Sequence, residues 1–105
     1  MGLDAAVYAD DAQDRQVSSL RIGNSSLVAF LRNEISGLGC DAPVLQEKVL
    51  YSGTHAGDEL SLTEVESLRR ELRAAPPGSP ELEQFRGDLL ALCEIAVCHG
   101  RPIVF

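Results

Sequence analysis

The segment from Tyr51 to Glu59 carries the densest set of side chains that could do chemistry. It reads Tyr51-Ser52-Gly53-Thr54-His55-Ala56-Gly57-Asp58-Glu59. A histidine beside a carboxylate can act as a general acid and base. The same side chains are also types that ligate metal ions. A polar, glycine-containing loop held by a rigid scaffold is, in addition, a common place for contact with another protein.

The surrounding residues weaken the chemical readings of this segment. A metal site would need two more ligands at fixed spacing near His55, and none is adjacent. A cysteine nucleophile paired with His55 would have to come from Cys93 or Cys98, in an apolar helical segment where a thiolate is disfavoured. The sequence therefore predicts no metal, no other cofactor and no enzymatic activity. An enzyme that uses His55 and a nearby carboxylate as acid and base is the alternative.

Composition narrows the choice of partner. The 105 residues include 16 acidic and 9 basic side chains, and the formal net charge is −7. Binding of nucleic acid requires clustered lysine and arginine, so nucleic acid is excluded as an expected ligand. A basic protein is the more suitable partner, because complementary charge steers encounter.

Cysteine usage and hydropathy indicate the compartment. The chain has three cysteines, an odd number that argues against a disulfide framework. No apolar run approaches the roughly 20 residues that a membrane span needs. The start of the chain lacks a basic region followed by an apolar stretch, so no signal peptide is expected. We therefore expect a cytoplasmic protein that does not bind membranes.

Strands are predicted at both ends of the chain. Residues 1–9 and 17–22 are apolar enough to pair as a hairpin across a polar turn. Residues 102–105 end the chain on Ile-Val-Phe, which favours a buried terminal strand because loose termini are usually polar. Residues 44–51 are ambiguous: a strand over 47–51 is preferred, and a short helix is the alternative.

Capping signals mark three helices. Their N-caps are one of Asn24, Ser25 and Ser26, then Ser61, then Ser79. Ser61 and Glu64 match the capping box, and Pro80 follows Ser79 at the first helical position. Gly100 stands where a left-handed C-cap ends the last helix. The residues expected on the solvent side of the second helix are Glu66, Arg69, Arg70 and Glu71.

These elements predict an α+β fold in a single domain over residues 1–105. A small, mostly antiparallel sheet, made of the N-terminal hairpin and the C-terminal strand, should pack against about three helices.

Three segments together resemble a known family. Residues 1–3 (MGL) open directly into a strand, and residues 18–23 (SSLRIG) precede a helix that contains residues 30–35 (FLRNEI). The chain closes with residues 92–105 (LCEIAVCHGRPIVF). This combination is similar to the Imm70 type of immunity protein from bacterial polymorphic toxin systems. Those relatives carry a Gly-Glu-Trp-like motif before the second helix, where this chain reads Gly57-Asp58-Glu59-Leu60.

The resemblance implies an α+β protein that binds and blocks a cognate toxin and has no catalytic activity. An acidic inhibitor would suit a basic toxin such as a nuclease. The residues expected to contact the toxin are His55, Asp58 and Glu59. A dimeric regulatory or structural subunit that associates through exposed apolar surface is a further alternative.

Overall fold

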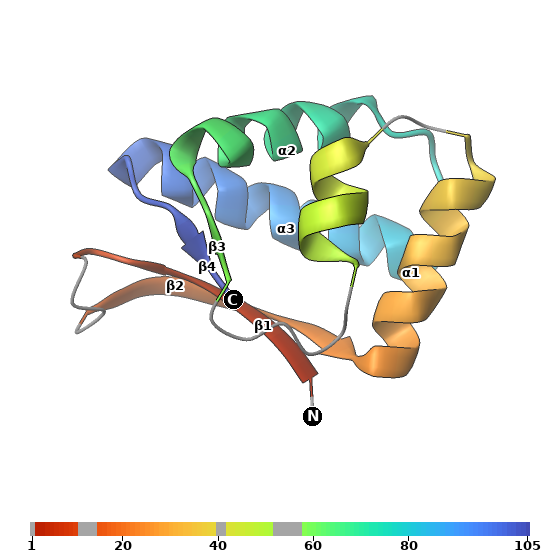
Figure 1. Cartoon of the computed structure of the whole chain (residues 1–105), viewed down its shortest axis with the longest axis horizontal. Helices are drawn as coiled ribbons and strands as arrows, with labels where there is room; N and C mark the ends of the chain where they lie inside the picture. Colours follow the sequence, from red (N-terminus) through yellow and green to blue (C-terminus); the bar gives the residue numbers. More distant parts are fainter. Residues whose placement is uncertain (1, 11–14, 40–41, 52–57) are drawn as a thin grey trace.

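The chain forms one helical layer on one face of a small sheet. The computed structural model describes residues 2–10, 15–39, 42–51 and 58–105. Its elements follow the order β1 (Gly2–Tyr8), β2 (Gln16–Asn24), α1 (Ser25–Gly37), η1 (Leu45–Val49), β3 (Glu59–Leu60), α2 (Leu62–Ala74), α3 (Pro80–His99) and β4 (Ile103–Val104). The described strands pair antiparallel in the order β2-β1-β4-β3, with the helices gathered on one side (Figure 1). The predicted α+β class is confirmed.

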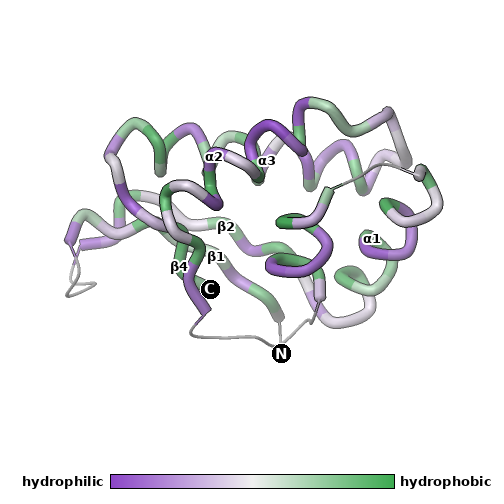
Figure 2. Tube along the Cα trace, turned by 45° about the horizontal axis from the view of Figure 1, so that its top comes forward, coloured by the Kyte–Doolittle hydropathy of each residue, from purple (hydrophilic) through white to green (hydrophobic). Residues whose placement is uncertain are grey.

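The β1–β2 hairpin gives the sheet its two different faces. In β1, Leu3, Ala5 and Val7 are buried against the helices. The residues between them belong to the opposite face, as the period of two in a strand requires. In the second half of β2, Leu20 and Ile22 likewise alternate with exposed Arg21. Hydrophobic and hydrophilic residues are mixed along this strand (Figure 2). One face of the hairpin is therefore core and the other has no helix over it.

A C-terminal strand is present, as predicted, but it is short. β4 lies between β1 and β3: Val104 pairs with both Ala6 and Glu59. Ile103 is fully buried. Val104 is half-buried because it belongs to the face without helices, and Phe105 is half-buried and packs against the core. β4 thus joins β3 to β1 within the sheet.

The three predicted helices begin at the predicted caps. Asn24 accepts the N–H of Leu27 at 2.9 Å. Ser61 and Glu64 form the reciprocal capping box, with bonds of 3.3 and 3.0 Å. The α3 helix starts after Ser79 and ends at Gly100, whose φ of 64° is left-handed. Within the described residues, no helix is long and apolar enough to cross a bilayer.

The preferred strand over 47–51 is wrong, and the helical alternative is correct. Leu45–Val49 forms η1, a short π-helical segment in which the N–H of Leu50 bonds to the carbonyl of Leu45 at 2.9 Å. Leu45 and Val49 lie on one side and are both fully buried. The Glu71 carboxylate from α2 accepts the N–H groups of Val44 (3.1 Å) and Leu45 (2.9 Å). The free N–H groups at the start of this helical segment, which has no local side-chain cap, are thus bonded by a residue of a distant element.

Two of the side chains expected to be solvated on α2 are instead tied to other elements. Glu71 is the acceptor just described, and Arg69 donates to Glu94 of α3 at 3.1 Å. The Glu34 carboxylate of α1 similarly accepts the backbone N–H (2.7 Å) and hydroxyl (2.6 Å) of Ser79. Part of the acid surplus therefore holds the helical layer together.

Candidate functional site

Two of the three predicted contact residues, Asp58 and Glu59, lie where the chain enters the sheet edge. Asp58 and Glu59 are exposed, and Glu59 begins β3. His55 lies outside the described residues. The short strand β3 was not predicted. Its two residues lie in the segment that the sequence analysis treated as a loop before the helix capped by Ser61.

Main-chain bonds hold these two carboxylates in place. The N–H of Phe105 donates to the carbonyl of Asp58 at 2.8 Å, and Glu59 pairs with Val104. Leu60, the next residue, is buried and pairs with Ile103. Exposed acidic side chains are therefore carried on a backbone that is anchored in the core.

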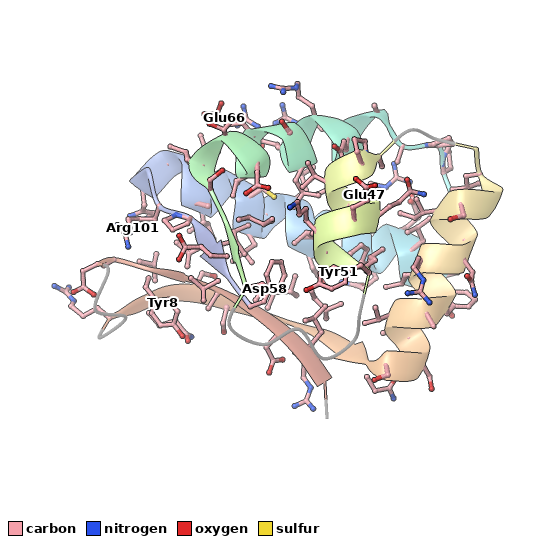
Figure 3. The ribbon with its side chains drawn as sticks, in the orientation of Figure 1. Tyr8, Glu47, Tyr51, Asp58, Glu66 and Arg101 are labelled. Atoms are coloured by element: carbon pink, nitrogen blue, oxygen red, sulfur yellow. The ribbon has the colours of Figure 1, made fainter. Side chains whose placement is uncertain are left out.

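Tyr51, which begins the polar segment singled out in the sequence but was not predicted as a contact residue, joins this position. The Tyr51 hydroxyl donates a hydrogen bond to the Asp58 carboxylate (Figure 3). The Tyr51 carbonyl in turn accepts from the Arg32 guanidinium of α1 at 3.0 Å. Asp58 is thus linked to the helical layer as well as to the sheet. Tyr51 looked like the end of a strand in the sequence, and its distance from Asp58 could not be read there.

The hydrogen bond to Asp58 raises the pKa of Tyr51 above its ordinary value, with smaller contributions from loss of solvent and from the carboxylate charge. The phenol therefore stays protonated around neutral pH. Tyr51 can donate a hydrogen bond there and is unsuited to act as a base.

The two described cysteines differ from each other. Cys93 is fully buried, and burial is the main cause that raises the pKa of its thiol to about 12; Glu94 adds to the rise and Arg69 opposes it. Cys98 is exposed, so the apolar surroundings expected to disfavour a thiolate are found at Cys93 but not at Cys98. A buried thiol with a raised pKa is not a nucleophile near neutral pH.

Among the described residues, no three side chains of the histidine, cysteine, aspartate or glutamate types lie close enough together to hold a metal ion. His55 and Cys40 lie outside that set.

The open face of the sheet contains a surface hollow. It has a volume of about 480 Å³, and Asp4 and Tyr8 of β1, Ser19 and Arg21 of β2, and Phe105 border it. Asp4 and Arg21 stand opposite each other in the β1–β2 register, so opposite charges face across the strands. The sequence analysis named none of these residues as functional; it predicted only that residues 1–9 and 17–22 pair as a hairpin.

Comparison with known proteins adds no relative: no family model, no curated protein and no solved structure matches the chain.

Proposed function

We propose that this chain is an immunity protein, which binds a cognate bacterial toxin in the cytoplasm and neutralises it without catalysis. The observation that carries the proposal is the pair Asp58 and Glu59, two exposed carboxylates on a backbone fixed by β4. Preorganised charges are suited to binding, because they lose little freedom when a partner docks.

The charge of the molecule supports the same reading. A net charge of −7 favours encounter with a basic partner, and a toxin that acts on nucleic acid must itself carry basic residues. The resemblance of residues 1–3, 18–23, 30–35 and 92–105 to Imm70-type proteins supports the toxin as that partner. His55 is proposed as a third contact residue.

The test is survival of cells that express the toxic domain encoded beside this gene, with and without this protein. Protection by the wild-type chain is expected, and the double variant Asp58→Lys/Glu59→Lys should protect less. Both side chains are exposed, so this variant should remain folded even though Asp58→Lys removes the acceptor of the Tyr51 hydroxyl.

The matched control is Glu47→Lys/Glu66→Lys, which changes the net charge equally on the helical side of the molecule, where Glu66 stands at the top of α2 (Figure 3). The proposal fails if the neighbouring gene encodes no toxic domain, or if cells die equally with and without this protein. Equal protection by both double variants would support the toxin as the partner but would refute the proposal that Asp58 and Glu59 contact it.

A further inference from the structure

We propose that the outer edge of β2 binds an extended segment of a partner protein as an additional strand, and that this segment carries basic residues on the side that faces α3. The inference rests on the proposed function in one respect only, that the chain binds another protein.

The first observation is the position of β2 at the end of the sheet. β2 is the longest strand described, and within the described residues it pairs only with β1. An edge strand presents a row of N–H and C=O groups to any extended chain that approaches. Peptides are recognised in this way when main-chain bonds supply affinity and alternate side chains enter flanking hollows.

The register limits where such a strand fits. The β1–β2 pairing is interrupted near Ile22 and again near Val17, where the register shifts. Between these irregularities, residues 18–21 pair regularly with residues 4–7. Bulges discourage pairing at an edge. The docked segment therefore pairs with residues 18–21 and is about four or five residues long, spanning about 13 Å.

The second observation is a groove beside this edge on the helical side. Its volume is about 230 Å³, and it lies between β2 and the first half of α3. Half-buried Leu20 and Leu27, with buried Phe85, form its apolar part. Figure 1 shows α3 on the helical face of the sheet, above the β1–β2 hairpin. A strand added to β2 would direct every second side chain into this groove.

The third observation is the charge on the rim. Glu81 and Asp88 of α3 border the groove and are exposed. They are two helical turns apart, about 10.5 Å along the axis, and so lie on one side of the helix. Lysines at the first and last of five strand positions are about 13 Å apart, a separation that flexible side chains match. Arg21 also borders the groove, but it stands opposite Asp4 in the register and belongs to the open face.

These charges favour a basic partner over a second copy of this chain. Two β2 edges joined antiparallel about a two-fold axis would place both α3 helices on the same side of the joined sheet. The two acidic rims would then approach each other, and each copy has a net charge of −7. Like charges across an interface oppose association.

The probe for the test is a blocked peptide of about seven residues in which lysine, valine and lysine occupy alternate positions and serine fills the others. Binding to the intact protein is followed by titration, and hydrogen exchange of individual amides locates it. We expect slower exchange in β2, and no binding when glutamate replaces both lysines.

The variant Glu81→Lys/Asp88→Lys should weaken peptide binding at least tenfold, equivalent to about 1.4 kcal/mol. The control Glu47→Lys/Glu66→Lys should weaken it less than threefold. Because Glu81 lies in the first turn of α3 and a lysine there opposes the helix dipole, Glu81→Gln/Asp88→Asn serves as a milder second variant with an intermediate effect.

The proposal is overturned if millimolar peptide does not slow exchange in β2, or if both double charge reversals weaken binding equally. Slow exchange in β2 that depends on protein concentration without peptide would identify a second copy as the occupant and also overturn it. None of these results depends on the toxin, so the survival assay and this assay fail separately.

Discussion

Tyr51 and Asp58 show how one side-chain pair links a surface position to two layers of the fold. The Tyr51 hydroxyl donates to the Asp58 carboxylate. The Tyr51 carbonyl accepts a hydrogen bond from the Arg32 guanidinium, and the Asp58 carbonyl accepts one from the N–H of Phe105. Both the hydrogen bond and the negative charge favour the neutral phenol, which explains the direction of the Tyr51 pKa shift. The stabilisation from this bond is present below the ordinary phenol pKa and is lost as the pH rises through the raised one.

Replacing Asp58 with asparagine should therefore lower the pKa of Tyr51 toward its ordinary value near 10. Ultraviolet absorbance of tyrosinate measures it, in a Tyr8→Phe background that leaves a single tyrosine. Phenylalanine preserves the Tyr8 carbonyl that accepts from Arg101 at 3.0 Å. Glu59→Gln should leave the titration unchanged. A midpoint that Asp58→Asn does not move would show that the bond is absent in solution.

At the scale of elements, local signals predicted every helix whose cap lies in its own sequence. Asn24, Ser61 and Ser79 each bond to the first turn that follows them, and that information is contained in four consecutive residues. The segment from Leu45 to Val49 was misassigned because its cap comes from Glu71, far along the chain. A run of Val49, Leu50 and Tyr51 has strand character until that distant contact is known.

The site was predictable to the same degree. Asp58 and Glu59 could be placed on the surface before a capped helix, because that relation is local. The partnership with Tyr51 and the hollow on the open face depend on the pairing of β4 with β1 and β3. Register between strands that are distant in sequence is fixed by the packed core, which composition does not reveal.

The role of Glu71 as a distant cap gives a stability prediction. Glu71→Ala should lower the free energy of unfolding by about 2–3 kcal/mol, because two part-buried N–H groups lose a charged acceptor. Glu66→Ala, in the same helix, is the matched control and should cost about 0.5 kcal/mol or less. Urea unfolding measures both. Equal losses would mean that water replaces the carboxylate and that η1 does not need it.

The C-terminal strand gives a second prediction at this scale. Deleting residues 102–105 should sharply lower the thermal midpoint, since β4 is the strand that joins β3 to β1. Ile103→Ala should by itself cost about 2–5 kcal/mol, the usual range for emptying a fully buried site. Val104→Ala, at a half-buried position, should cost less. A truncated protein that melts like the full-length chain would refute the structural role of this strand.

At the scale of the whole molecule, the net charge overstates the acid that a partner meets. Glu34 and Glu71 accept backbone N–H groups, and Glu94 of α3 is paired with Arg69 at 3.1 Å and Arg73 at 2.5 Å. Glu59 at the sheet edge and Glu81 on α3 are exposed and have no such role among the described residues, so they are available to a partner. The positions of the exposed carboxylates therefore matter more for partner binding than the net charge of −7.

Salt dependence of the association rate separates location from total charge. Asp58→Lys/Glu59→Lys and Glu47→Lys/Glu66→Lys change the net charge equally. At about 0.15 M salt the Debye length is about 8 Å, so charges away from the contact are screened. The molecule measures 38 × 28 × 21 Å, so most of its charges lie farther than one Debye length from any single contact. The variant Asp58→Lys/Glu59→Lys should then associate with the toxic domain more slowly than Glu47→Lys/Glu66→Lys.

At about 0.01 M salt the Debye length is about 30 Å, comparable to the molecule itself, and the two rates should converge because every charge then steers the encounter. Stopped-flow fluorescence over this range measures both rates. A constant ratio between the two variants at all salt concentrations would show that Asp58 and Glu59 act through short-range contacts and not by steering. Rates that are equal throughout would exclude this pair from the contact surface.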